Sequence, residues 1–315
     1  MSLATNSYVA GVGADPTFPH LFAHAERKDV TPRLGTELRN IQLAQLTDEQ
    51  VEELALFISQ RGCVFFRDQE LSEDQHVQLA ERFGGAIDHV HAVGTHPSLI
   101  RLHADENSHA VSGEAWHSDM CEEAIPPAFS ILMIERTPPS GGDTMFANMY
   151  AAFDKLSPHI KKTLSGLTAQ NRRPVTTLRK EAVDRSQVNS HPLIRTHPVT
   201  GWQMLFANPV FTTHIDGLTV PESQALLKFL ETHVDKGVDF QIRFHWEPNS
   251  VAIWDNRAVQ HQAVWDYWPS VRDGRRVAVK GDQPFYRTEG GSQTEAMMGS
   301  KAPPSWNRLK DWRIS

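Results

Sequence analysis

Short hydrophobic runs bounded by Gly, Pro and Asn dominate the chain from residue 98 onward and constrain its fold most. They are short, rich in β-branched and aromatic residues, and separated by turn residues, as strands of an all-β domain are. They cover residues 99–102, 129–134, 144–147, 203–206, 240–244 and 250–254. Many short strands joined by such turns are typical of a jelly roll or a barrel. The sequence therefore predicts a mainly β fold with helices.

Helical patterns precede and interrupt these runs. Capping boxes at residues 47–50 and 72–75 predict the starts of two helices, which end near Gly62 and Gly84. The segment between them, residues 63–66, is predicted to be a buried strand. Further helices are expected to open at Ser157 and to run from Pro221 to about Val234. We expect the early helices to pack on one sheet.

The chain is expected to form one main domain over residues 31–290. Residues 1–30 are polar and irregular and are expected to be an N-terminal arm. Residues 291–315 are expected to be a C-terminal extension. Residues 169–195 are polar and weakly patterned, and long irregular loops in compact domains often serve as lids. A lid over the mouth of the barrel is therefore expected there.

Composition excludes several classes of function. The 315 residues are 40% hydrophobic with a net charge of −7, as in an ordinary globular protein. This balance gives no basic surface for nucleic acid or for an anionic membrane. No apolar run approaches the roughly 20 residues that span a bilayer, and no secretory signal is recognisable. The two cysteines, Cys63 and Cys121, favour a reducing, cytoplasmic location. Composition leaves open whether the chain forms a homo-oligomer.

Four His-x-Asp pairs are candidate metal ligands, and geometry distinguishes between them. Residues two apart on a strand face the same side, whereas on a helix they lie about 200° apart. The pair at His233 lies at a helix end and the pair at His214 in a turn, so both are set aside. The pair at His103 follows a strand and is the geometric rival of His117 and Asp119. Two imidazoles and one carboxylate are the ligand set of non-haem Fe(II) oxygenases.

Further motifs surround these residues in a fixed order. They are Phe65-Phe66-Arg67-Asp68-Gln69, Trp116-His117-Ser118-Asp119, Gly141-Gly142-Asp143-Thr144, Arg195-Thr196-His197-Pro198, Trp254-Asp255-Asn256-Arg257 with His261, and Arg272 and Arg276 with Gly281-Asp282. From about residue 31 to 287 the chain resembles the taurine dioxygenase/2,4-D dioxygenase (TauD/TfdA) family of Fe(II)- and 2-oxoglutarate-dependent oxygenases. The resemblance implies a double-stranded β-helix (jelly-roll) core and O2 as co-substrate. It also implies that His117, Asp119 and His261 bind the iron.

The resemblance assigns two arginines downstream of His261. In the family, the arginine eleven residues beyond the distal histidine and the threonine of Gly-Gly-Asp-Thr bind the far carboxylate of 2-oxoglutarate. Here these are Arg272 and Thr144. The arginine fifteen residues beyond holds the acidic group of the substrate in members that oxidise sulfonates and aryloxyacetates, and here it is Arg276. A guanidinium binds such anions bidentately. Strand alternation should point the neighbouring Arg275 the other way.

The rest of the substrate pocket departs from the taurine pattern. His89 and Phe211 match pocket positions of the family. The asparagine four residues before His117 is replaced by Gly113, and a tyrosine three residues after His89 is replaced by Ala92. Two polar contacts to a sulfonate are thereby lost and room is gained. We expect a small anionic substrate, such as a sulfonate, carboxylate or amino acid, and expect taurine to be a poor one.

Hydroxylation is the expected reaction, with cleavage of a C–S, C–O or C–N bond where the attacked carbon carries the heteroatom. Desaturation or cyclisation in a biosynthetic pathway would use the same cofactors. Two alternatives come from other classes: a non-catalytic metal-binding jelly roll, and a zinc hydrolase with the same three ligands. Oxygen consumption with 2-oxoglutarate distinguishes these alternatives.

Overall fold

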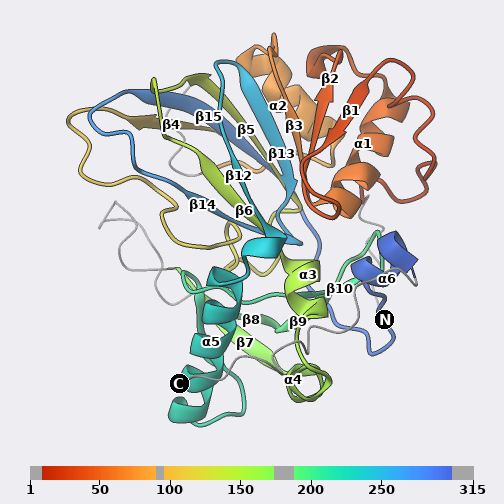
Figure 1. The fold of residues 1–315 in the computed structure, drawn as a ribbon, viewed down its shortest axis with the longest axis vertical. Coiled ribbons are helices and arrows are strands. Elements are labelled where there is room, and N and C mark those ends of the chain that lie inside the picture. Colours follow the sequence, from red (N-terminus) through yellow and green to blue (C-terminus); the bar gives the residue numbers. More distant parts are fainter. Residues whose placement is uncertain (1–8, 90–95, 174–187, 300–315) are drawn as a thin grey trace, which may run out of the picture.

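Two facing sheets form the core of the computed structural model, which describes residues 9–89, 96–173 and 188–299 (Figure 1). The larger sheet has the strand order β1-β2-β3-β13-β5-β15-β4 and the smaller sheet the order β12-β6-β14. The strands of the larger sheet are β1 (Glu26–Asp29), β2 (Thr36–Arg39), β3 (Cys63–Phe66), β4 (Leu99–Ala104), β5 (Phe129–Arg136), β13 (Ser250–Asp255) and β15 (Arg272–Val279). Those of the smaller sheet are β6 (Thr144–Asn148), β12 (Gln241–Phe244) and β14 (Val259–Ala263). The predicted jelly-roll core is confirmed.

Alternation along the strands builds two hydrophobic layers. On β3, Phe65 points between the sheets and stacks on Phe244 with ring centroids 3.9 Å apart, while Phe66 points outward. The outer layer is covered by helices α1 (Asp48–Arg61) and α2 (Glu73–Arg82), which begin at the predicted capping boxes. Helices thus pack on one face of the larger sheet, as expected, and the other face packs against the smaller sheet.

The N-terminal segment packs on α1. Leu21 is fully buried, and Phe18 contacts the ring of Phe57 edge to face at 5.2 Å. The buried Glu53 carboxylate accepts hydrogen bonds from the backbone N–H groups of His20 and Leu21 at 3.0 and 2.6 Å. The described part of residues 1–30 is therefore fastened to the fold, and the boundary expected after residue 30 stays a prediction.

A second group of elements lies beside one end of the two sheets (Figure 1). It contains β7 (Thr168–Arg172), β8 (Val188–Pro192) and β11 (Thr212–Ile215) in one sheet and β9 (Ile194–Thr196) with β10 (Gln203–Leu205) in another. Its helices are α3 (Met149–Asp154), α4 (Pro158–Leu164) and α5 (Val220–Asp235). The two ends of the segment 169–195 are thus strands and not irregular loop. Residues 174–187 lie outside the described residues, and the lid stays a prediction.

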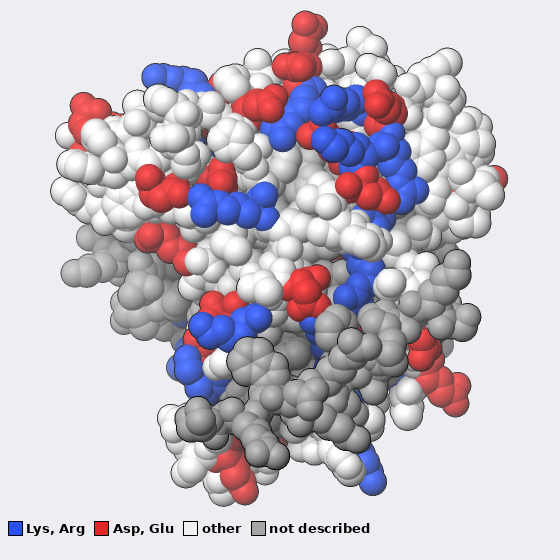
Figure 2. Space-filling model, in the orientation of Figure 1, with Lys and Arg blue, Asp and Glu red and all other residues white. Residues whose placement is uncertain are grey.

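The C-terminal end of the described chain returns to this group. Helix α6 (Gln293–Met298) packs near α3, and the fully buried Gln293 donates through Nε2 to the backbone oxygen of Gln60 at 2.8 Å. Acidic and basic side chains are interspersed over the face of the molecule in Figure 2. Across the described ranges, no helix has the length and hydrophobicity that a membrane crossing requires.

Candidate active site

Three side chains converge beside β14, whose middle residue is His261. His117 Nε2 lies 3.7 Å from Asp119 Oδ1, and His261 Nε2 lies 3.9 Å from the same oxygen. One ligand atom from each residue falls within 4.8 Å of the others. Residues 117–119 lie outside the named strands: His117 makes only an isolated bridge to His261, with backbone N–H···O distances of 3.1 and 2.8 Å. That bridge, and not strand periodicity, brings the three side chains together.

Hydrogen bonds orient the first two candidate ligands. His117 Nδ1 lies 2.7 Å from the backbone oxygen of Ala115, and donation there leaves Nε2 as a free lone pair facing the site. Ser130 donates through Oγ to Asp119 Oδ2 at 2.9 Å, so Oδ1 is the oxygen turned toward the imidazoles. Partners of this kind fix the tautomer and direction of metal ligands.

Electrostatics keep these groups in metal-binding states. Burial lowers the pKa of His117, and burial with the adjacent His117 lowers the pKa of His261 well below its ordinary value. Burial alone would raise the pKa of Asp119, but Arg276 and the two imidazoles outweigh it and hold that pKa far below its usual range. Neutral imidazoles beside a carboxylate are the protonation states that bind a divalent cation.

The structure places Arg276, His89 and Phe211, which the resemblance assigns to the substrate pocket, near this centre. Arg276 Nη1 donates to Asp119 Oδ1 at 2.5 Å, and the Phe211 ring centroid is 6.4 Å from that of His117. Arg276 and Phe211 line a cavity of about 500 Å³ that also reaches His117 and Asp119. Arg276 Nε and His89 Nε2 are buried and have no hydrogen-bond partner in the part of the chain that the structure describes. Burial, helped by Arg276, lowers the pKa of His89 to about 4.

Arg272 and Thr144 lie next to each other, one strand step away from His261. On the paired strands β14 and β6, Ala263 faces Thr144, and His261 two residues earlier faces Phe146. Two residues along a strand span about 7 Å. Arg272 Nη2 lies 3.5 Å from Thr144 Oγ1, and its Nε donates to the backbone oxygen of Gly142 at 2.9 Å. The pair can therefore hold an anion within reach of the three converging side chains.

The two residues that competed with the assigned ones in the sequence, Arg275 and His103, lie away from this centre. Arg275 points to the opposite face of β15, where its guanidinium contacts His76 and Glu135, as alternation predicted. His103, the rival ligand, is half-exposed and bonded through Nδ1 to Asp273 at 2.5 Å. The structure therefore does not bring His103 to the three converging side chains.

Gly113 has a structural reason to be glycine. Its φ is +88°, a conformation that other residues rarely adopt. A Cβ there would lie 2.9 Å from His117 Cε1. The position that holds a polar pocket residue in the resembled pattern is here pressed against a candidate ligand. Ala92, the other departure, lies outside the described residues.

Sequence reasoning missed the role of Asn256. Its side chain accepts the backbone N–H of Asp119 at 2.7 Å and donates to the backbone oxygen of Asp119 at 3.0 Å. A buried amide thus fixes both polar groups of the residue whose carboxylate faces the imidazoles. The motif Trp254-Asp255-Asn256-Arg257 was the available signal, but only the structure shows what its asparagine contacts.

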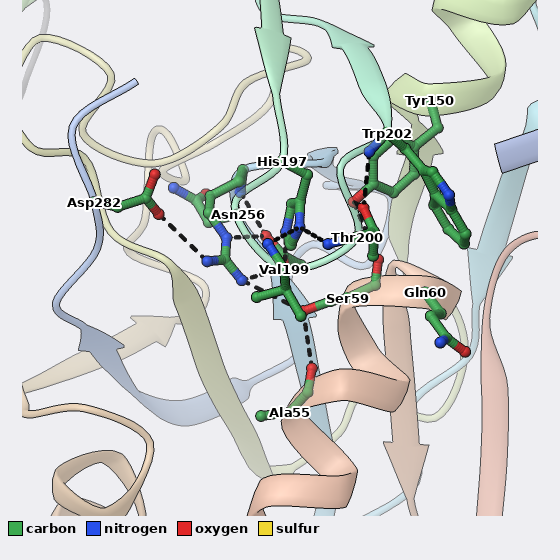
Figure 3. A network of polar contacts seen from close by, with 12 residues as sticks. Ala55, Ser59, Gln60, Tyr150, His197, Val199, Thr200, Trp202, Asn256 and Asp282 are labelled. Carbon is green, nitrogen blue, oxygen red and sulfur yellow. Dashed lines mark hydrogen bonds and ion pairs between the residues drawn. The ribbon is translucent and has the colours of Figure 1, made fainter. Parts of the chain in front are cut away.

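A buried ionic network lies beside Asn256 (Figure 3). Arg257 donates to both oxygens of Asp255 at 2.9 and 2.6 Å, and His197 Nε2 lies 2.9 Å from Asp255 Oδ2. Asp282 accepts from Arg257 at 3.3 Å and from Arg195 at 2.8 Å. His197 follows β9 in a loop and is fully buried in this network. The network joins three of the motifs noted in the sequence.

A jelly roll with two imidazoles and one carboxylate converging at one end is the architecture of a mononuclear non-haem metalloenzyme of the oxygenase class. The chain belongs to the taurine catabolism dioxygenase TauD, TfdA family, whose model matches residues 26–278. An alpha-ketoglutarate-dependent sulfonate dioxygenase of Saccharomyces cerevisiae is 35% identical over 86% of this chain and 72% of its own length. An alpha-ketoglutarate-dependent sulfate ester dioxygenase of Pseudomonas putida is 33% identical over 83% of this chain and 92% of its own.

Solved structures agree with this assignment. A taurine dioxygenase from Burkholderia xenovorans superposes with a TM-score of 0.74 at 32% identity and covers 85% of this chain and 95% of its own. The family resemblance read from the sequence motifs is therefore confirmed.

Proposed function

We propose that this chain binds Fe(II) through His117, Asp119 and His261 and uses 2-oxoglutarate and O2 to oxidise a small anionic substrate. Family membership makes the chain a dioxygenase that depends on 2-oxoglutarate, the alpha-ketoglutarate of its relatives' names. It sets aside the non-catalytic jelly roll and the zinc hydrolase. The observation that carries the metal assignment is the convergence of three ligand atoms within 4.8 Å.

The donor set fits Fe(II). Two neutral imidazole nitrogens and one carboxylate oxygen suit a borderline-hard divalent ion, and a triad on one side of the ion leaves its other positions open. When bound, the iron supplies the redox chemistry that couples O2 to the oxidative decarboxylation of 2-oxoglutarate. The chain contributes orientation: Ser130 directs Asp119 Oδ1, and Ala115 directs His117 Nε2.

Arg272 and Thr144 are the proposed site of the distal carboxylate of 2-oxoglutarate. The separation of about 7 Å along β14 between His261 and the Thr144 level suits a five-carbon diacid that reaches both. Burial lowers the pKa of Arg272, yet a guanidinium stays charged in proteins. A half-buried cation whose described hydrogen-bond acceptors are uncharged oxygens favours a carboxylate beside it.

We propose that Arg276 binds the acidic group of the substrate and so recognises its charge. It bonds to Asp119 and lines with it the cavity of about 500 Å³, and its Nε has no hydrogen-bond partner among the described residues. Asp119 Oδ1 also faces both imidazoles, so an ion bound there would compete with Arg276 for that oxygen. The guanidinium could then turn to an acidic group in the cavity. Two relatives are named for sulfonates and for sulfate esters, which supports an anion of this kind.

Part of the wall of the cavity of about 500 Å³ is apolar. Val111, Met120, Val210 and Phe211 line it beside the charged residues. We infer a substrate with an acidic group and an apolar body, with hydroxylation next to a heteroatom as the expected reaction. The two free cysteines, both buried, support the expectation of a reducing compartment.

The test is succinate formation by the Fe(II)-loaded protein with alkyl sulfonates, alkyl sulfates and carboxylates, each paired with a neutral ester or amide. Acids should trigger turnover and their neutral counterparts should not. Arg276→Ala should impair use of the acid more than it raises the KM for 2-oxoglutarate. Arg276→Lys should recover only part, because an ammonium lacks the planar fork. A neutral ester that is turned over as well as its acid would refute charge recognition by Arg276.

A further inference from the structure

A second, smaller cavity of about 200 Å³ adjoins the substrate cavity. Its walls include Ala263, Tyr267 and Arg272. It shares residues 110–112 with the larger cavity, so the two spaces are neighbours. Ala263 lies two residues beyond His261 on β14, opposite Thr144. The smaller cavity therefore occupies the place where the far end of 2-oxoglutarate would lie, and any role for its walls rests on that proposed co-substrate site.

Tyr267 enters this cavity from the loop between β14 and β15, and the loop is anchored. Asp266, next to it, accepts the N–H of Gly142 at 2.8 Å and the guanidinium of Arg243 at 2.8 Å. The backbone oxygen of Gly142 accepts a hydrogen bond from Arg272 Nε. Gly142 therefore connects the loop that carries Tyr267 to Arg272. Tyr267 is itself buried. Its ring is thus held at a fixed place beside Arg272.

The Tyr267 hydroxyl is free to act as a donor. Within the described ranges it has no hydrogen-bond partner. Its oxygen is not fully buried, so a ligand in the cavity can reach it. Burial raises the pKa of Tyr267, although Arg272 lowers it in part, so the phenol keeps its proton at neutral pH. A protonated phenol beside a cation can donate to an anion that the cation attracts.

The other donors near Arg272 are partly used. Arg272 Nε is taken by Gly142, and Thr144 Oγ1 already accepts from Trp246 Nε1 at 3.0 Å. The Thr144 hydroxyl proton and Arg272 Nη1 remain, because Arg272 Nη2 already makes a long contact of 3.5 Å to Thr144 Oγ1. A carboxylate has about four acceptor positions, and one that loses its water is stabilised by filling them. One further donor is therefore useful at this place, and Tyr267 lines the same cavity.

We propose that the Tyr267 hydroxyl donates a hydrogen bond to the distal carboxylate of 2-oxoglutarate, beside Arg272 and Thr144. It is then a binding residue for the co-substrate and favours diacids over monoacids of the same head group. The bond is absent for a 2-oxo acid that lacks a distal carboxylate, such as pyruvate.

The experiment compares Tyr267→Phe with the unaltered chain by calorimetric titration of the Fe(II)-loaded protein without oxygen. Tyr267→Phe keeps the ring and removes only the hydroxyl. The Kd for 2-oxoglutarate should rise about tenfold, as expected when one charge-assisted hydrogen bond is lost. The Kd for pyruvate should not change. Tyr286→Phe, outside both cavities, is the matched control and should leave both constants unchanged.

Two outcomes overturn the proposal. Unchanged binding of 2-oxoglutarate by Tyr267→Phe, while Arg272→Ala binds it far more weakly, shows that the hydroxyl makes no contact. Equal weakening of 2-oxoglutarate and pyruvate shows a packing effect instead. If Arg272→Ala also binds 2-oxoglutarate normally, the co-substrate site itself is misplaced. The failure of the proposed function is thus distinguishable from the failure of the tyrosine assignment.

Discussion

His117, Asp119 and His261 form a ligand set only because each presents one lone pair to a common point. Replacing any one of them by Ala removes a donor that no described neighbour can supply, so Fe(II) binding should be lost and turnover abolished. His103→Ala is the matched control, because His103 also belongs to a His-x-Asp pair but is bonded to Asp273. Metal content by elemental analysis decides. Loss of iron in His103→Ala with retention in His117→Ala would refute the assignment.

A substitution at Gly113 allows the strain of a left-handed backbone to be separated from the crowding of His117. Gly113→Ala puts a Cβ 2.9 Å from His117 Cε1 on a backbone with φ of +88°. Gly166→Ala suffers the same left-handed backbone, at +76°, with nothing within 4 Å of its Cβ. Each should lose about 1 kcal/mol of stability. Only Gly113→Ala should also weaken Fe(II) binding, measured by titration. Equal metal affinity in the two variants would show that His117 moves aside freely.

The turn between β13 and β14 is coupled to the segment 117–119 through Asn256. Asn256→Ala deletes the acceptor and the donor that hold the backbone of Asp119, so its carboxylate should lose direction. Removal of such supporting contacts costs about 10- to 100-fold in metal affinity. Asn171→Ala is the control, since Asn171 is equally buried but bonds within β7 and to Thr212. It should destabilise the fold and leave metal affinity unchanged. If Asn256→Ala destabilises the fold without weakening metal binding, the coupling is disproved.

The sequence predicted those helices and strands that are specified by neighbouring residues, such as a capping box or a hydrophobic run. The two capping boxes start α1 and α2, and the hydrophobic runs became β4, β5, β6, β10, β12 and β13. Strands β7, β8 and β11 were missed because they are polar, and their place is set by pairing with one another. The candidate ligands were predictable from the residue types and their spacing. Their convergence was not, because it depends on a bridge between His117 and His261 across 144 positions of chain.

The buried ionic network explains why distant motifs occur together. Asp255, Arg257, His197, Arg195 and Asp282 come from three separate segments and are mutually paired. Each buried charge is costly alone, so the loss of one partner leaves another uncompensated. Sequence reading could place these residues in motifs, but their pairing is a property of the assembled sheets and could not be derived from spacing.

Stability of the whole molecule should fall in mild acid, and His76 allows one source to be isolated. His76 is fully buried between α2 and the larger sheet. Its Nδ1 accepts from Arg275 Nε at 3.3 Å, and its Nε2 donates to the backbone oxygen of Ile131 at 3.1 Å. Both contacts suit the neutral ring. Burial, with Arg275 adding to it, lowers the pKa of His76 to about 3 from an ordinary 6.5.

The direction in which stability changes with pH follows from the number of protons that each state binds. Between about pH 3 and 6.5 the unfolded chain binds a proton at His76 that the native chain excludes, so the free energy of unfolding decreases as pH falls through this window. His76→Gln can keep both hydrogen bonds but cannot titrate. In urea titrations without added metal, the unaltered chain should lose about 2 kcal/mol more than His76→Gln between pH 7 and pH 5. Equal losses would mean that His76 is protonated in the native state, and the neutral buried ring would have to be abandoned.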